Sequence, residues 1–348
     1  MHYGDLVERL YRENKLFSVL LELTYRCNLD CFICYNDRER AGKPLSLDQY
    51  YQLLQDLNEM QVMNITLSGG EPLAHPDFWK IGARGRARGF VMRIKSNGHA
   101  LRPEVIQRLQ KEIDPYSVEI SLHGATAETH DRQTRSPGSF MQLRQNLLHM
   151  KKAGLRVQLN CPLTRWAEPE VEMIYEIADE LGYPLIFDSH ITPRDNGDKE
   201  PQSIAPTDEG LRKLFHLQKI RGALVEPVCG NDQSNTQTAE RKHCGTGSMT
   251  LAIDPYGTVY PCVALRRPAG SLHEHSVTEI WDESIALKGI RKLAIEAASN
   301  VASLGPYTAM GGFCPGLSDM LCGDPATVHP GVIHVGQLKR DCLKDDSI

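Results

Sequence analysis

The first two-thirds of the chain alternates short apolar runs with amphipathic stretches. The apolar runs predict strands and the amphipathic stretches predict helices. This alternation is typical of a parallel sheet with crossover helices, in six strand–helix units. The predicted strands are Ser18–Thr24, Met63–Ser68, Val91–Ser96, Ser117–Leu122, Arg156–Pro162 and Leu185–Ile191. The predicted helices are Ser46–Met60, Pro76–Arg88, Pro103–Ile113, Phe140–Ala153, Pro169–Leu181 and Thr207–Leu217.

The pattern changes in the last third, where helical periodicity gives way to glycine, proline and cysteine. The boundary falls in the polar segment Pro193–Pro206, and the helix after it closes the first domain. A hairpin is expected where Met249–Ile253 and Thr258–Pro261 flank the turn sequence Asp254–Gly257. Such a loop-rich region has little core of its own, so metal ligation is expected to stabilise it. The expected domains are 1–220 and 221–348.

Composition and charge exclude several classes of function. The chain has 348 residues, 41% of them hydrophobic, and its net charge of -5 does not provide the basic excess of a nucleic-acid-binding surface. Met1–Lys15 alternates charged and apolar residues, unlike a secretory signal, and no apolar run reaches membrane-spanning length. We therefore expect a cytoplasmic protein with no nucleic-acid or membrane partner.

The chain has 10 cysteines, and three of them lie close together after the first predicted strand. In a reducing compartment this usage indicates metal or redox chemistry rather than disulfides. Cys27, Cys31 and Cys34 form a C-x3-C-x2-C run at the end of a strand, which in a parallel barrel is the active-site face. Three thiolates can hold three irons of a cubane cluster and leave the fourth iron open. A structural zinc knuckle is the alternative, although it needs a fourth ligand and none is nearby.

This spacing resembles the cluster-binding motif of radical S-adenosylmethionine (SAM) enzymes. The resemblance implies that Cys27, Cys31 and Cys34 are catalytic cluster ligands and that the open iron chelates the amino and carboxylate groups of SAM. Many members have an aromatic residue just before the third cysteine, whereas here Ile33 holds that position beside Tyr35. Both are expected cofactor contacts. The implied fold is a partial (β/α)6 TIM-like barrel of the α/β class with a C-terminal loop-rich Fe-S domain.

A second match follows the second strand. Its two glycines allow close backbone approach to a ligand, and Glu71 adds an acceptor for an ammonium group at a solvent-facing strand end. The family's Gly-Gly-Glu-Pro segment binds the methionyl amino group. The resemblance implies that Ser68, Gly69, Gly70 and Glu71 bind the methionyl amino group here. A Gly-Gly turn alone is most often only a turn.

Polar residues also stand at the ends of the third and fourth strands. Hydroxyl and amide groups suit ribose, and a guanidinium suits a carboxylate. The resemblance implies that Ser96, Asn97 and Ser121 contact the cofactor, and that one of Arg132 or Arg135 pairs with the methionyl carboxylate. Either arginine can instead be a solvated surface charge.

The C-terminal cysteines resemble the auxiliary-cluster extension called SPASM, or its shorter relative Twitch. Cys244 and Cys262, with Gly257 between them, match its opening, but only Cys314 and Cys322 stand where the full pattern has four close cysteines. The six candidate thiolates suffice for one 4Fe-4S cluster and are two short for a second, unless Asp319, Asp324, a solvent ligand or substrate completes it. Structural zinc is the alternative. The candidate ligands are Cys229, Cys244, Cys262, Cys314, Cys322 and Cys342.

The substrate is inferred from resemblance alone. Proteins with this extension often modify ribosomally made peptides, and Ile191–Asp198 resembles a segment common among such maturases. We therefore expect a 5'-deoxyadenosyl radical to abstract a hydrogen atom from a peptide, to crosslink or otherwise modify it. The alternatives are oxidation, epimerisation or dehydration of a small molecule such as an aminoglycoside, sulfatase-type maturation, and a non-catalytic Fe-S electron carrier.

The implied partners follow from this chemistry. An external donor such as flavodoxin or ferredoxin would supply the electron. No added peptide-binding domain is evident in the sequence, so a peptide leader would bind a separate protein or the barrel itself.

Overall fold

One sheet organises the computed structural model, which describes residues 9–225 and 244–345. In this part of the chain its strands follow the order β6-β5-β4-β3-β2-β1-β7-β8-β9. Strands β1 to β6 are parallel, β7 pairs parallel with β1, and the pairs β7–β8 and β8–β9 are antiparallel. The strands are β1 (Ser18–Glu22), β2 (Asn64–Ser68), β3 (Val91–Ser96), β4 (Ser117–Ser121), β5 (Val157–Pro162), β6 (Leu185–Asp188), β7 (Thr250–Ile253), β8 (Thr258–Tyr260) and β9 (Gly270–Ser271).

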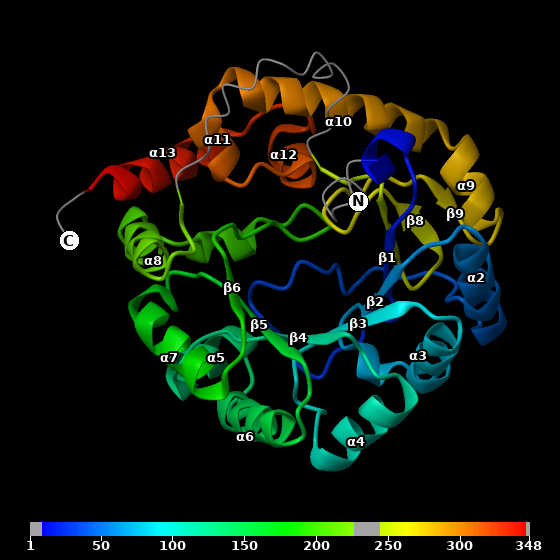
Figure 1. The fold of residues 1–348 in the computed structure, drawn as a ribbon, viewed down its shortest axis with the longest axis horizontal. Coiled ribbons are helices and arrows are strands. Elements are labelled where there is room, and N and C mark those ends of the chain that lie inside the picture. Colours follow the sequence, from blue (N-terminus) through cyan, green and yellow to red (C-terminus); the bar gives the residue numbers. More distant parts are fainter. Residues whose placement is uncertain (1–8, 226–243, 346–348) are drawn as a thin grey trace.

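Helices cover the outer face of the curved sheet, so that the strands form an open barrel (Figure 1). Each predicted helix of the first two-thirds is present, and their starts follow local capping. Ser46, for example, begins the first one with a capping box to Gln49. The helices are α2 (Leu47–Glu59), α3 (Phe78–Ala87), α4 (Pro103–Glu112), α5 (Ala127–Thr134), α6 (Ser139–Lys152), α7 (Val171–Leu181) and α8 (Asp208–Ile220). The described residues also form three short 3-10 turns, η1 (Pro72–Ala74), η2 (Glu168–Glu170) and η3 (Glu200–Ile204).

Alternation along the strands separates an apolar layer from a polar one. In β3, Met92 and Ile94 are buried in the main core, whereas Arg93 and Lys95 are only partly buried. Successive side chains of a strand point to opposite faces, so the polar set shares the face away from the helices. There Lys95 is ion-paired with Glu119 of β4. The inner face of the barrel is therefore polar.

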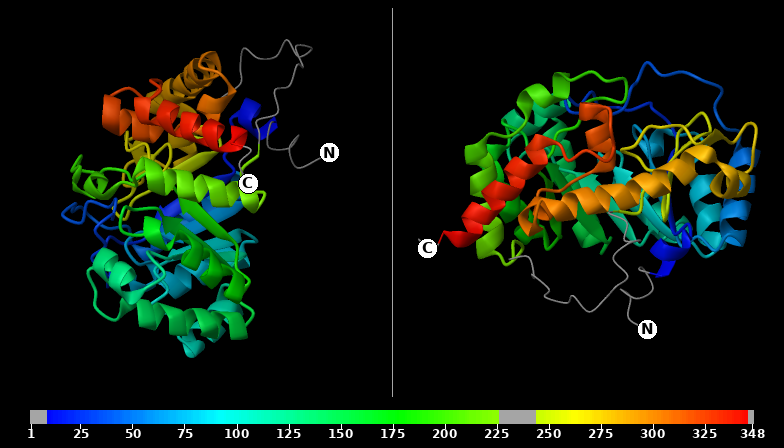
Figure 2. Two further views of the ribbon diagram at one scale, coloured as in Figure 1. Left: turned by 90° about the vertical axis from the view of Figure 1, so that its left-hand side faces the viewer. Right: turned by 90° about the horizontal axis from the view of Figure 1, so that it is seen from above.

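The C-terminal third differs from the loop-rich region that the sequence indicated. It contains several helices, and the longest of them runs along one edge of the barrel (Figures 1 and 2). The expected hairpin is confirmed as β7 and β8. The helices are α9 (Val277–Glu283), α10 (Ile285–Ser303), α11 (Pro306–Met310), α12 (Pro315–Cys322) and α13 (Pro330–Lys344).

This region also shares the core of the barrel. Leu251 and Ile253 of β7 belong to the same buried cluster as Val19 and Leu21 of β1, and Trp281 of α9 joins them. The parallel pairing of β1 with β7 makes this contact, because it continues the barrel sheet into the C-terminal third. The two expected domains are therefore joined by one sheet and one core.

Among the described residues, no helix is both long enough and apolar enough to cross a membrane.

Candidate active site

The loop after β1 that carries Cys27, Cys31 and Cys34 is fixed by the end of helix α5. The backbone N–H of Asp30 donates to the carbonyl oxygen of Thr134 over 3.2 Å, and that of Phe32 donates to the carbonyl of Gln133 over 2.8 Å. These bonds lie on either side of Cys31. The end of helix α5 therefore holds the middle cysteine in place through backbone carbonyls.

The three thiols are partly buried and lie close enough to affect one another. Burial raises the pKa of Cys31 to about 12, and the neighbouring Cys34 and Cys27 raise it further in that direction. Burial also raises the pKa of Cys27. Thiols that repel each other's charge in this way become thiolates when a bound metal supplies positive charge. The donor set therefore suits a metal cluster.

Nitrogen donors from other elements face these sulfurs. Nδ2 of Asn97, just after β3, lies 3.6 Å from Sγ of Cys27. Nε2 of His123, just after β4, lies 3.8 Å from Sγ of Cys31. Burial lowers the pKa of His123 to about 4, so its ring is neutral. Neutral N–H donors can stabilise thiolates without competing for the metal.

No three His, Cys, Asp or Glu side chains among the described residues converge on a single ion position. In a cubane cluster each thiolate bonds its own iron, so its ligands do not need to converge in the way that mononuclear zinc ligands do. The geometry of the cysteine loop is compatible with separate iron positions.

The two glycines after β2 pack against the chain that leads into the cysteine loop. Gly69 has φ +132, and an added Cβ would lie 2.3 Å from the carbonyl oxygen of Thr24. A Cβ on Gly70 would lie 2.4 Å from the carbonyl oxygen of Arg26. A side chain at either position would therefore push the cysteine loop away. The sequence analysis expected the two glycines to let a ligand come close to the backbone. In the structure they also let the protein's own backbone at Thr24 and Arg26 come close.

Glu71 is not at a solvent-facing strand end, as the sequence analysis had it. The residue is 2% exposed. Its carboxylate accepts hydrogen bonds from the hydroxyl of Ser96 (3.0 Å), the backbone N–H of Asn97 (2.9 Å) and the backbone N–H of Leu73 (3.3 Å). Burial raises its pKa to about 7, against the lowering effect of these donors. Glu71 thus orients the residues at the end of β3.

The other expected cofactor contacts lie at the same end of the sheet. Ser68 is buried at the end of β2, and Ser121 ends β4 in register with Asn160. Ile33 is partly buried in the cysteine loop. The hydroxyl of Tyr35 donates to Oε1 of Glu22 over 3.2 Å. Tyr35 is therefore engaged with the barrel wall.

The two candidate arginines have different surroundings. Arg135 is paired with Asp30 at 3.5 Å and with Glu200 at 3.4 Å. The guanidinium of Arg132 stacks on the ring of Trp166, 4.0 Å from its centroid, and has no carboxylate partner among the described residues. Arg132 is thus the arginine that remains available to an added carboxylate.

The segment after β6 closes onto the cysteine loop. A guanidinium nitrogen of Arg194 donates to the carbonyl oxygen of Phe32 over 3.2 Å. The backbone N–H of Asp195 donates to the carbonyl oxygen of Tyr35 over 2.8 Å. These residues belong to Ile191–Asp198, which the sequence analysis related to the substrate by resemblance alone. The contacts give this segment a position beside the cysteines.

A buried ionic group, which the sequence analysis missed, connects this segment to the C-terminal third. Arg266 forms two hydrogen bonds to Glu22 of β1, at 2.7 and 2.9 Å, and lies 3.1 Å from Asp195. The side chains of Arg266 and Glu22 are 8% and 0% exposed. No sequence motif indicates this group, because it forms between residues that are far apart in the chain.

A second group of cysteines forms in the C-terminal third. Burial raises the pKa of Cys244 to about 11, and Cys262 and Cys314 are near enough to raise it further. The backbone N–H of Leu265 points to Sγ of Cys262 at 3.3 Å. Cys244, Cys262 and Cys314 are thus brought together from positions far apart in the sequence.

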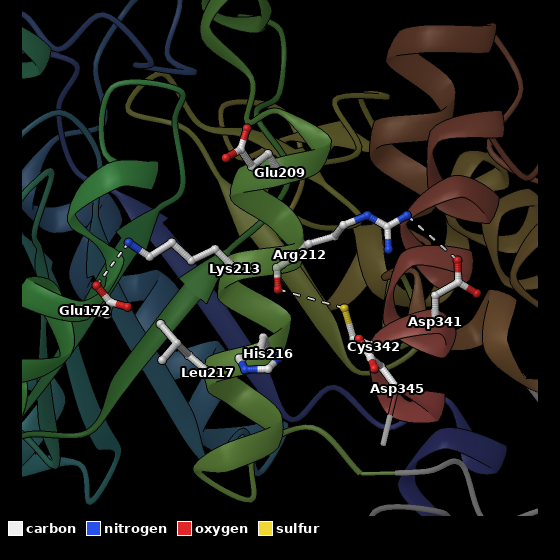
Figure 3. Close-up of a pocket in the computed structure, with 9 residues that line it drawn as sticks. All are labelled: Glu172, Glu209, Arg212, Lys213, His216, Leu217, Asp341, Cys342 and Asp345. Carbon is white, nitrogen blue, oxygen red and sulfur yellow. Dashed lines mark hydrogen bonds and ion pairs between the residues drawn. The ribbon is translucent and has the colours of Figure 1, made fainter. Parts of the chain in front are cut away.

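The remaining candidate ligands lie elsewhere. Cys342 is buried between α13 and α8, with its Sγ 4.0 Å from the carbonyl oxygen of Arg212 (Figure 3). It belongs to an apolar cluster that includes Leu211, so packing, and not ligation, explains its burial. Cys322 is exposed at the end of α12. Cys229 lies outside the described residues.

The two carboxylates considered as extra ligands already have protein partners. Asp319 is paired with Arg267 at 2.6 and 3.0 Å. Asp324 caps the turn before α13 through the backbone N–H of Ala326 (3.0 Å) and the hydroxyl of Thr327 (2.6 Å). Neither carboxylate is free to complete a cluster without losing these contacts.

A cleft of about 380 Å³ lies beside Cys342 between α8 and α13 (Figure 3). Charged side chains of both signs line it, among them Arg212, Lys213 and Asp341. It contains none of the other candidate residues. The cleft is therefore separate from the cysteine loop.

Comparison with known proteins agrees with the two groups of cysteines. The model of the radical SAM superfamily matches residues 21–182, and that of an iron-sulfur cluster-binding domain, SPASM, matches residues 244–301. The first match includes the cysteine loop. The second includes Cys244 and Cys262 and ends before Cys314.

Similar proteins extend over most of the chain. Mycofactocin maturase MftC of Mycobacterium ulcerans is 29% identical, over 84% of this chain and 81% of the relative. The AdoMet-dependent heme synthase of Methanosarcina barkeri is 26% identical, over 78% and 83%. The PqqA peptide cyclase of Ruegeria pomeroyi is 27% identical, over 90% and 86%.

Solved structures share the fold at lower identity. Native anSMEcpe with bound AdoMet and Cp18Cys peptide has a TM-score of 0.71 at 16% identity, covering 94% of this chain and 96% of that one. Streptococcus suis SuiB bound to precursor peptide SuiA has a TM-score of 0.64 at 15% identity, covering 83% and 70%. The fold is thus shared over most of this chain in both.

Proposed function

The chain belongs to the radical SAM superfamily and carries a SPASM-type iron-sulfur domain, and from this premise we propose that it modifies a ribosomally made peptide. It is an enzyme whose cofactors are SAM and Fe-S clusters. The proposal concerns the substrate and the role of each residue. It is supported most by the relation to the PqqA peptide cyclase, which extends over 90% of the chain.

The cysteine loop is the proposed site of the catalytic cluster. Cys27, Cys31 and Cys34 are the proposed ligands of a 4Fe-4S cluster, because their thiols form one group that neutral N–H donors face. When bound, the cluster and SAM supply a 5'-deoxyadenosyl radical that takes a hydrogen atom from the substrate. The role of the protein is to place the substrate and exclude water.

The ends of β2, β3 and β4 are the proposed SAM-binding residues. Asn97 is directed to the cysteine loop by the bond from its backbone to buried Glu71. Arg132 is the proposed partner of the methionyl carboxylate, since Arg135 is already paired with two protein carboxylates. The remaining proposed contacts are Ile33, Tyr35, Ser68, Gly69, Gly70, Ser96 and Ser121.

Cys244, Cys262 and Cys314 are the proposed core of one auxiliary cluster. Their proximity supports this assignment. Cys229 is a further candidate ligand, whereas the packing of Cys342 against α8 argues against its participation. The paired state of Asp319 likewise argues against a carboxylate ligand.

The peptide itself would enter the polar inner face of the barrel, near the segment after β6. Arg194 and Asp195 of that segment contact the cysteine loop, so a bound peptide there would lie beside SAM. We further propose that a flavodoxin or ferredoxin supplies the electron and that a separate protein presents the peptide leader. A small-molecule substrate is the second candidate, favoured by the relation to the heme synthase.

A peptide assay tests this proposal. The reconstituted protein is incubated anaerobically with SAM, dithionite and a synthetic short peptide encoded beside its gene. We expect 5'-deoxyadenosine formation to increase with the peptide, together with a mass change in the peptide that a scrambled peptide does not undergo. An unmodified peptide, with turnover of a small molecule from the same gene cluster, would support the second candidate.

A further inference from the structure

The buried side chain of His123 faces the middle cysteine of the loop. Its Nε2 lies 3.8 Å from Sγ of Cys31, within hydrogen-bond range for sulfur. The residue is 6% exposed, so no solvent molecule replaces this contact easily. The other ring nitrogen, Nδ1, lies 2.9 Å from Nε2 of Gln133. Both nitrogens are thus engaged, one with the protein and one with the cysteine.

Gln133 determines which ring nitrogen carries the proton. Its Oε1 accepts a hydrogen bond from the hydroxyl of Thr164 over 2.7 Å, so its amide N–H group points to the histidine. An amide nitrogen can only donate, which makes Nδ1 of His123 the acceptor. Since Nδ1 accepts, the ring carries its proton on Nε2, directed at the sulfur.

The same glutamine also fixes the cysteine. Its backbone carbonyl accepts the N–H of Phe32 over 2.8 Å, next to Cys31. One residue of α5 therefore sets the position of both the donor and the acceptor. Both Gln133 and Thr164 are fully buried, which makes the arrangement rigid.

We propose that His123 is a positioning residue that donates a hydrogen bond to the Cys31 thiolate and makes the N-terminal cluster easier to reduce. This inference rests on the proposed function, in which Cys31 binds an iron. Reduction adds one negative charge, and a hydrogen bond to a ligand sulfur stabilises the more negative state. An outer-shell donor of this kind adjusts a metal site without touching the metal.

His130 provides a comparison within the same part of the fold. It is also buried, its ring centroid lies 5.5 Å from that of His123, and its Nδ1 lies 3.0 Å from the hydroxyl of Ser139. Its Nε2 meets no partner among the described residues, cysteine sulfurs included. His130 thus serves as a matched control for the loss of a buried histidine.

The test compares three variants of the whole, reconstituted protein: His123→Leu, His123→Gln and His130→Leu. The reduction potential is read by EPR-monitored titration, using the signal that changes when SAM is added. Loss of a hydrogen bond to a charged group should make reduction about tenfold less favourable in His123→Leu. For a one-electron couple this is a shift of about 59 mV to more negative potential.

His123→Gln keeps an N–H donor near the sulfur and should recover part of the shift, whereas His130→Leu should leave the potential unchanged. A His123→Leu protein with normal iron content and the wild-type potential would overturn the inference. An equal shift in His130→Leu would do so too, because it would show that loss of any buried histidine nearby has the same effect.

A second measurement does not require any variant to fold. Pulsed EPR of the reduced wild-type protein, labelled with 15N-histidine, should show a weak nitrogen coupling in the SAM-sensitive signal. Absence of that coupling would contradict the hydrogen bond. A wild-type protein that binds the cluster but fails to cleave SAM would instead count against the proposed function, whatever the potential of the variants.

Discussion

The side-chain amide of Asn97 lies 3.6 Å from the sulfur of Cys27, although the two residues are 70 positions apart in the sequence. The first follows β3 and the second follows β1, so the parallel sheet brings the two strand ends to one edge. Buried Glu71 at the end of β2 supports Asn97 from behind. The sheet thus assembles the proposed cofactor site from three successive strand ends.

Glu71 should matter for folding as well as for cofactor binding. In Glu71→Gln, one amide N–H would face the backbone N–H of Leu73 or Asn97, which leaves a buried donor without an acceptor. We expect the free energy of unfolding to fall by about 1–3 kcal/mol, measured by urea denaturation. Glu39→Gln, at an exposed position, is the control and should have little effect. Equal stabilities of the two variants would show that Glu71 acts only on the ligand.

The auxiliary site can be separated from the catalytic one by iron content. A triple Cys27/Cys31/Cys34→Ala variant should retain about four irons per chain after reconstitution. Further replacement of Cys244 and Cys262 should remove most of this iron, because these thiols belong to the second group. Zinc in place of iron in the triple variant would contradict an auxiliary Fe-S cluster.

Cys342→Ala is the matched test of the ligand assignment in the C-terminal third. Its thiol is packed between α13 and α8, so iron content should stay at the wild-type value while stability falls slightly. Iron and sulfide analysis measures the first quantity and thermal unfolding the second. A loss of about four irons would show that Cys342 is a ligand after all.

Arg266 should be a main support of the junction between barrel and C-terminal third. Arg266→Met leaves Glu22 and Asp195 buried without their cation, and we expect the free energy of unfolding to fall by about 3–5 kcal/mol. The neighbouring Arg267 is paired with Asp319 but is 43% exposed, so Arg267→Met should cost at most about 1 kcal/mol. Urea denaturation of the two variants compares them, and similar losses would refute the role of Arg266.

The buried His130 should make the fold sensitive to acid. Burial, and next the neighbouring His123 and His99, lower its pKa to about 3, whereas an unfolded histidine titrates near 6.5. The folded state therefore holds a neutral ring, and its stability is lost as the pH falls below about 6.5. Between pH 7 and pH 5 this loss amounts to about 2 kcal/mol.

His130→Asn tests this pH dependence, since asparagine can keep the bond to Ser139 but does not titrate. The free energy of unfolding of both proteins is measured at pH 7 and at pH 5. The difference between their two losses gives the contribution of His130, because the contributions of all other titrating groups are the same in both proteins. The variant should lose about 2 kcal/mol less than the wild type. Parallel curves would mean that His130 has the same pKa in the folded and unfolded states.

Local patterns predicted much of the barrel. The strands and helices of the first two-thirds show clear periodicity, and the hairpin of β7 and β8 is marked by its turn residues. The short helix α5 was missed because Ala127–Thr134 is largely polar. The helices after β9 were missed because the sequence analysis gave the glycine, proline and cysteine residues of this third more weight than its helical stretches.

Contacts distant in sequence were beyond such patterns. The pairing of β7 with β1 depends on the tertiary fold, and so does the burial of Glu71. Cysteine count alone does not distinguish Cys342, which packs against α8, from Cys314, which joins the other thiols. The C-x3-C-x2-C run was informative because its three members lie in one loop.

Anaerobic SAM cleavage tests the central claim most directly. The reconstituted protein with dithionite should release 5'-deoxyadenosine. Cys27→Ala, Cys31→Ala or Cys34→Ala should each abolish the release, because each removes one of the three proposed cluster ligands. Cys161→Ala, which alters a buried thiol on β5, should retain it. Undiminished release of 5'-deoxyadenosine in any of the three loop variants would contradict the account.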